Sequence, residues 1–122
     1  LVDMEEQAER LLEASIVAGA LTVEGLAGSH APFDARIHAA SGLPGQIRVA
    51  GHLRALLTDS EILRSHEHCE RVQDPYAVRC MPQVFGAVEH TLDESRAAAV
   101  GRFAHRARSR SLQRVSRILS AR

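Results

Sequence analysis

The 122-residue sequence is 45% hydrophobic and 25% charged, which is the balance of a soluble globular protein with one core and excludes a chain disordered throughout. No apolar run approaches the length of a membrane span, so we expect no membrane partner. The formal net charge of 0 hides a split: residues 1–99 hold all 15 acidic residues and eight arginines, whereas residues 100–122 hold seven arginines and no acid.

The predicted elements of the first half are helical, because Ala and Leu are frequent and aromatic residues make up only 3% of the chain. The pattern predicts a helix over residues 4–21 behind an acidic first turn, and a short second helix over residues 23–26. Residues 33–45 contain two glycines and a proline, which predicts an ordered loop around a helical turn. Apolar residues at helical spacing then predict an amphipathic helix over residues 46–57.

In the second half, Asp59-Ser60-Glu61 indicates the start of a short helix. The polar stretch 66–82 contains Pro75 and Pro82, and each disfavours helical geometry at the residue before it, so we expect a structured loop with one helical turn. Asp74 followed by Pro75 is typical of an N-cap with proline at the first helical position. Pro82 predicts the start of a long helix over residues 83–100. The fold class we expect is all-α.

The strongest local signal is the stretch Arg71–Val84, which reads RVQDPYAVRCMPQV. Tyr76 and Arg79 are three residues apart, so on one helical turn they project from the same face, and Gln73 precedes that turn. An arginine binds a carboxylate through two nitrogens, and a phenol can donate or accept a proton. The three side chains would therefore suit an anionic amino-acid substrate. On spacing alone, residues of these types are more often found in other roles, Arg79 as a surface or ion-paired residue and Tyr76 with its ring packed in a partly buried site.

The same stretch resembles the RVQDPYSLRC-x-PQV segment of the histidine ammonia-lyase family. Three further segments follow the family's order and approximate spacing: VAGALTVEGLAGSHAPFDARIHAA at 17–40, PGQIRVAGHLRALLTDSEI at 44–62 and SHEHCERVQDPY at 65–76. The resemblance covers about residues 5–98. Because the chain starts with Leu1 inside a helical pattern, we expect it to be an internal fragment of such an enzyme.

The resemblance implies a bundle of long, mainly antiparallel helices of the ammonia-lyase and fumarase-like fold, assembled as a homotetramer in the cytoplasm. The family eliminates ammonia from L-histidine without oxidation and forms urocanate. Its catalyst is the electrophile 4-methylidene-imidazol-5-one, which forms by cyclisation of an internal Ala-Ser-Gly, and no metal is required. The family's electrophile segment precedes the region seen here, so we expect the isolated chain to be inactive.

The resemblance also assigns roles to three residues. Arg79 would hold the substrate carboxylate, and Tyr76 would be the catalytic residue beside the electrophile, where it assists proton transfer. Gln73 would bind near the electrophile and the substrate through hydrogen bonds. Phe85 occupies a position at which the family often has His, a departure that affects packing or the substrate end of the site.

Ala40-Ser41-Gly42 spells the tripeptide from which the family forms its electrophile. Its context is that of a loop between ARIHA and LPGQ, whereas cyclisation needs a compressed and protected backbone. A bare tripeptide match often arises by chance. We therefore expect no cofactor to form from Ser41.

The similarity ends near Val100, where the Arg-rich segment 100–122 begins. A cluster of arginines can bind RNA or an anionic lipid surface. The loss of similarity and the change of charge coincide, and together they favour a tail with no evolved role, such as a shifted reading frame in a GC-rich gene. We therefore expect a helical segment over residues 1–99, a tail over residues 100–122 and no nucleic-acid partner.

The remaining metal-ligand types give weaker signals. His66-Glu67-His68-Cys69 could be drawn as a metal cluster, but no further ligand pair is near, so a solvated loop is expected. Cys69 and Cys80 are expected to be reduced thiols of a cytosolic protein. The other histidines, His38 among them, are expected at the surface or in loops. Two alternatives to a histidine ammonia-lyase stay open: a phenylalanine or tyrosine ammonia-lyase fragment, and a truncated or frameshifted product without catalysis.

Overall fold

The computed structural model describes the backbone of residues 2–66 and 73–120, and the side chains of residues 3–66 and 73–102. Every regular element in those ranges is helical, as the composition predicted. In chain order the elements are α1 (Val2–Gly25), η1 (Ala31–Phe33), α2 (Ala35–Ser41), α3 (Pro44–Leu56), α4 (Glu61–Ser65), α5 (Tyr76–Arg79) and α6 (Met81–Ser120). The chain divides into two compact units, residues 1–92 and residues 93–122.

Helix α1 joins two helices that the sequence predicted as separate. It runs from Val2 to Gly25, because no breaker lies between residues 21 and 23, and the Thr22 hydroxyl donates to the Ala18 carbonyl within the helix at 2.7 Å. The helix is then closed by a turn in which Ala27 has a φ of 47° and the Gly28 N–H donates to the Val23 carbonyl at 2.8 Å. This turn places Ser29 next to Asp74, which lies two residues before α5.

The core of the first unit is apolar and draws on almost every element. Helix α1 contributes Ile16, Ala20 and Val23, and the fully buried Phe33 comes from η1. The members contributed by the later elements are Val49, Leu53, Leu57, Leu63, Val78 and Met81, with Leu12 and Phe85 packed against them. Because burial of each large apolar side chain contributes about 1.5–3 kcal/mol, this cluster holds the short helices in place against α1.

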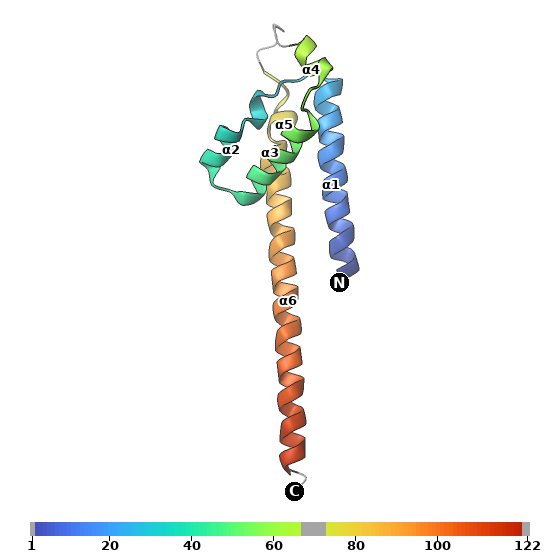
Figure 1. Ribbon diagram of the computed structural model, residues 1–122, viewed down its shortest axis with the longest axis vertical. Helices are drawn as coiled ribbons and strands as arrows, with labels where there is room; N and C mark the ends of the chain where they lie inside the picture. Colours follow the sequence, from blue (N-terminus) through green and yellow to red (C-terminus); the bar gives the residue numbers. More distant parts are fainter. Residues whose placement is uncertain (1, 67–72, 121–122) are drawn as a thin grey trace. The chain divides into compact units, whose positions relative to one another are not determined.

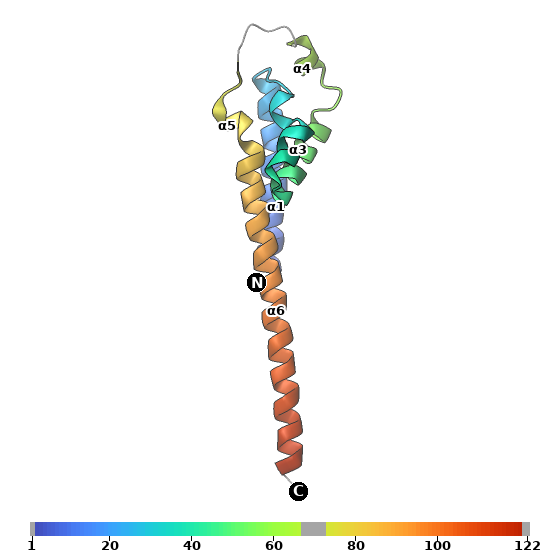
Figure 2. The same ribbon diagram turned by 90° about the vertical axis from the view of Figure 1, so that its left-hand side faces the viewer.

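Helix α1 and the first turns of α6 lie side by side and antiparallel (Figures 1 and 2). The contact is close at Gly19, where an added Cβ would come within 2.7 Å of the Met81 sulfur and 3.6 Å of the Phe85 ring. Phe85 therefore packs in this helix contact rather than in the candidate site. Only a residue without a side chain fits at position 19 without displacing Met81.

Helix α3 crosses the start of α6 backbone to backbone (Figure 1). A Cβ on Gly86 would lie 2.5 Å from the Gln46 nitrogen, and a Cβ on Gly45 would collide with the Gly86 carbonyl. The Arg48 Nε donates to the Glu89 carboxylate at 3.0 Å beside this crossing. Two glycines thus set how closely α3 approaches the helix that follows α5.

The boundaries of the shorter elements differ from the sequence prediction in instructive ways. The stretch 33–45, predicted as a loop around one helical turn, contains the seven-residue helix α2. Asp34 caps this helix by accepting the Arg36 N–H at 2.8 Å. Helix α3 starts two residues earlier than predicted, since Pro44 occupies the first helical position. Helix α6 continues past residue 100 to Ser120, because Gly101 does not interrupt it and the Arg-rich sequence favours helix.

Within the described residues, no helix is long and apolar enough to cross a membrane.

Candidate functional site

The candidate site is the single turn α5, which presents Tyr76 and Arg79 on one face, as the spacing predicted. Pro75 precedes the turn, and its carbonyl accepts the N–H groups of Val78 and Arg79 at 3.0 and 3.2 Å. Val78 is 3% exposed and anchors the turn in the core. The opposite face of the turn is therefore turned outward.

Tyr76 is the most exposed large side chain of this turn, with 74% of its surface accessible. The centre of the Arg79 guanidinium lies 5.9 Å from the centroid of its ring, within the range of a cation–π contact. Within the described residues, the ring is not packed into the core.

Arg79 is half-buried, and its Nε donates to the main-chain carbonyl of Asp74 at 3.0 Å. Among the residues that the structure describes, no carboxylate forms an ion pair with this guanidinium. A guanidinium has five N–H donors, so its terminal nitrogens keep donors for a carboxylate. Of the two alternatives for Arg79, a surface residue or an ion-paired one, the ion pair finds no partner in those ranges.

Gln73 is exposed and lies three residues before Tyr76. Across the described part of the chain, no hydrogen bond joins its side chain to Tyr76 or Arg79. The structure thus brings two of the three predicted site residues into contact and leaves the third beside them. Arg71 lies outside the described residues.

Asp74 is not the N-cap that its position before Pro75 predicted. Its side chain is 8% exposed, and Oδ2 accepts the N–H of Ser29 at 2.8 Å across 45 residues of sequence. The cap position of α5 belongs to Pro75, which has no side-chain donor or acceptor. The prediction was wrong because a buried carboxylate is stabilised more by this long-range hydrogen bond than by capping a one-turn helix.

Ala40-Ser41-Gly42 closes α2. Ser41 is the last helical residue and its hydroxyl donates to the His38 carbonyl at 2.7 Å, while Gly42 has a φ of 67° and is exposed. A helix end in solvent, capped in this way, is neither compressed nor protected. The tripeptide therefore does not fit the formation of the family's electrophile, in agreement with the sequence argument.

His38 corrects the expectation that the histidines outside the 66–69 cluster lie at the surface or in loops. It is fully buried, with Nε2 2.8 Å from the Pro32 carbonyl and Nδ1 2.9 Å from the Gln46 amide nitrogen. In this arrangement Nε2 donates to the Pro32 carbonyl and Nδ1 accepts from the Gln46 amide, so both ring nitrogens are engaged. The ring ties η1, α2 and α3 together and has no donor left for a ligand.

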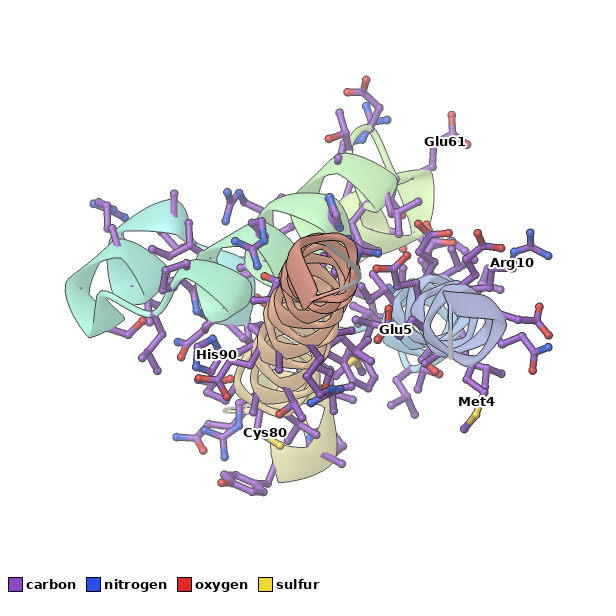
Figure 3. All side chains as sticks on the ribbon, turned by 90° about the horizontal axis from the view of Figure 1, so that it is seen from below. Met4, Glu5, Arg10, Glu61, Cys80 and His90 are labelled. Atoms are coloured by element: carbon purple, nitrogen blue, oxygen red, sulfur yellow. The ribbon has the colours of Figure 1, made fainter. Side chains whose placement is uncertain are left out.

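Of the four residues of the possible metal cluster at 66–69, only His66 lies within the described residues. Its Nδ1 lies 2.8 Å from the Ser65 hydroxyl and its side chain is exposed; residues 67–69 lie outside the described residues. In the part of the chain that is described, no three His, Cys, Asp or Glu side chains gather. Cys80 carries a free, half-buried thiol at the C-cap of α5, directly before α6 (Figure 3).

One open cavity of about 410 Å³ lies apart from α5, lined by His30, Ala31, Asp34, Ala35, Arg54 and Thr58. The charged groups around it are already engaged. Hydrogen bonds from the Arg36 side chain and backbone lower the pKa of Asp34 to about 2, and the Arg54 guanidinium donates to the Phe33 carbonyl at 2.6 Å. Charged side chains elsewhere, such as Arg10 and Glu61, point away from the ribbon (Figure 3).

A comparison with models of known protein families identifies the family of this chain. The model described as aromatic amino acid lyase matches residues 2–101. The chain belongs to the aromatic amino acid lyase family. The match includes α5 and both of its outward-facing side chains.

Individual members of the aromatic amino acid lyase family agree with this assignment. A histidine ammonia-lyase of Idiomarina loihiensis is 60% identical over 81 residues, which are 66% of this chain and 16% of that protein. A histidine ammonia-lyase of Myxococcus xanthus is 53% identical over 90 residues, 74% of this chain and 18% of that protein. The chain therefore spans about a sixth of the length of these relatives.

Among solved structures, the phenylalanine aminomutase of Pantoea agglomerans has the same fold over 75% of this chain and 21% of its own length. The TM-score is 0.64 and the sequence identity 28%. The all-α fold of the ammonia-lyases, expected from the sequence resemblance, is confirmed.

Proposed function

We propose that this chain is the substrate-binding segment of a histidine ammonia-lyase, which eliminates ammonia from L-histidine and forms urocanate. The observation that supports this most is α5 itself, where Tyr76 and Arg79 face outward from a buried anchor. The identity of 53–60% to histidine ammonia-lyases favours histidine over other aromatic amino acids.

In this proposal Arg79 binds the substrate carboxylate. Its terminal nitrogens form the planar fork that matches a carboxylate, and the Asp74 carbonyl fixes the guanidinium by its Nε. Binding at this point orients the amino acid and leaves its amino group and side chain free to reach the reacting groups.

Tyr76 is the proposed catalytic residue. In the reaction the Cα–N bond breaks, a proton leaves Cβ, and a double bond forms between the two carbons. In this proposal the Tyr76 hydroxyl takes up or returns a proton at its Oη near that bond; the exposure of Tyr76 and its contact with Arg79 support the role. Gln73 would donate and accept hydrogen bonds at the edge of the same surface.

The proposed cofactor is 4-methylidene-imidazol-5-one, the family's electrophile, which activates the substrate amine for departure. The geometry of Ala40-Ser41-Gly42 does not fit its formation. In the proposal the group therefore comes from a different segment of the enzyme, and this chain contributes the wall that binds and orients the substrate beside it. The assembly we propose is a homotetramer in the cytoplasm.

A phenylalanine- or tyrosine-specific lyase is the second candidate, favoured by the structural likeness to a phenylalanine aminomutase. The two candidates share the carboxylate-binding role of Arg79 and differ only in the aromatic side chain of the substrate. A truncated or frameshifted gene product without catalysis is the third possibility, and residues 100–122 are then a tail without a role.

The test uses a hybrid lyase, in which the 81 residues of this chain that align with the Idiomarina loihiensis histidine ammonia-lyase replace their counterparts in that enzyme. We expect the purified hybrid to form urocanate from L-histidine and to leave L-phenylalanine and L-tyrosine unchanged. The 122-residue chain by itself should form none. A hybrid that is folded and tetrameric but inactive on histidine, or that prefers phenylalanine, would overturn the proposal.

A further inference from the structure

The orientation of the Arg79 guanidinium depends on a main-chain atom. Its Nε donates to the Asp74 carbonyl at 3.0 Å, and the guanidinium centre lies 5.9 Å from the Tyr76 ring centroid. With Nε engaged, the edge formed by the two terminal nitrogens is the one left for a carboxylate. Whatever fixes the Asp74 carbonyl therefore fixes the direction from which Arg79 binds.

The side chain of Asp74 takes part in a second hydrogen bond. That carboxylate is 8% exposed and accepts the Ser29 N–H at 2.8 Å. Ser29 directly follows the turn that ends α1, where the Gly28 N–H donates to the Val23 carbonyl at 2.8 Å. The carboxyl group thus ties the residue that holds Arg79 to the end of the longest helix in the first unit.

We propose that Asp74 is a positioning residue, which aims the Arg79 guanidinium at the substrate carboxylate through its hydrogen bond to Ser29. This inference rests on the proposed function of Arg79. It adds a residue that touches neither substrate nor cofactor but sets the geometry of the one that does.

The turn α5 has two anchors, and only one of them controls the arginine. Val78 is 3% exposed and holds the turn in the core by apolar packing. Asp74 lies before Pro75, outside the helical hydrogen bonds of α5. Loss of the Asp74 anchor should therefore leave the turn folded and let the carbonyl shift, so the orientation of Arg79 is lost while the fold is kept.

The first experiment measures the hydrogen bond in the full 122-residue chain by NMR exchange of the arginine Nε–H signals. In Asp74→Ala, we expect the Arg79 Nε–H to exchange at least about fivefold faster. In Asp74→Asn, which keeps an acceptor oxygen for Ser29, the rate should stay within about twofold of the parent. The Arg36 Nε–H, bonded to Asp34 at 3.1 Å, is the internal control and should not change.

The second experiment measures binding in the hybrid lyase. Asp74→Ala should raise the KM for L-histidine about tenfold and change kcat by less than about threefold, because ground-state orientation is lost. Asp74→Asn should restore the parent KM. Inhibition by imidazole propionate, which has a carboxylate, should weaken, whereas inhibition by histamine, which has none, should not. A merely structural role would weaken both inhibitors.

The outcomes separate this inference from the proposed function. If Arg79→Ala leaves KM unchanged, the proposed function of Arg79 fails, and the NMR rates still decide whether Asp74 fixes its orientation. If Arg79→Ala raises KM and Asp74→Ala does not, the positioning role is overturned. An equal rise of KM in Asp74→Asn and Asp74→Ala also overturns it.

If Asp74→Ala does not fold, Ser29→Pro is the second variant, because it removes the N–H that donates to the Asp74 carboxylate. The same faster exchange of the Arg79 Nε–H and the same rise in KM are expected.

Discussion

The first unit contains two pairs of polar side chains, Tyr76–Arg79 and His38–Gln46, which lie in opposite surroundings. His38 is fully buried, and both ring nitrogens are engaged. Tyr76 is 74% exposed, and Arg79 keeps donors beyond its single bond to a main-chain carbonyl. Polar groups that satisfy one another hold the fold together, whereas those held in place but left open are available to a ligand.

The way each pair is held explains the difference. His38 and Gln46 hold each other and are enclosed by η1, α2 and α3. Tyr76 and Arg79 are held from behind, by the buried Val78 and by Asp74, so that none of the holding groups occupies the outer face. The contrast predicts that substitutions in the first pair change stability and substitutions in the second change activity.

Tyr76→Phe should have the largest effect. It removes only the hydroxyl and keeps the ring on which the Arg79 guanidinium rests, so KM for L-histidine should change little. Loss of the proton-transfer group should lower kcat of the hybrid lyase by about 10²–10⁴-fold. Urea unfolding of the variant chain should match the parent within about 0.5 kcal/mol. An unchanged kcat would show that the exposed hydroxyl takes no part in the reaction.

His38→Ala should have the opposite signature. The substitution leaves a cavity and deprives the Pro32 carbonyl and the buried Gln46 amide of their partners, which should lower the free energy of unfolding by about 3 kcal/mol. His52→Ala, on the exposed face of α3, is the matched control and should cost less than about 0.5 kcal/mol. Both values come from urea unfolding of the 122-residue chain. Equal values for the two variants would contradict the structural role of His38.

Much of the fold could be predicted from local patterns. Apolar spacing located the helices that became α1, α3 and α6, and Pro75 located the α5 turn, because these signals act within a few residues. The candidate site residues Tyr76 and Arg79 followed from their spacing, and their proposed roles from the family resemblance.

The helix boundaries were missed for local reasons, whereas the two misses of side-chain placement, Asp74 and His38, depend on contacts distant in sequence. The Asp74 side chain looked like an N-cap, but its partner Ser29 lies 45 residues earlier. His38 looked like a surface residue because the inner face of α2 is defined only after Gln46 of α3 packs against it. No short-range pattern distinguishes a buried histidine with two partners from an exposed one.

The most direct test of the central claim is the KM of the hybrid lyase for L-histidine when Arg79 is replaced by alanine. If Arg79 binds the carboxylate, Arg79→Ala should raise KM by about 100-fold, as expected for loss of a charge-assisted bidentate contact. Arg64→Ala removes an exposed arginine of α4 and should leave KM within about twofold. If both variants have the parent KM while the enzyme remains active, Arg79 does not bind the substrate and the outward face of α5 is not the binding wall.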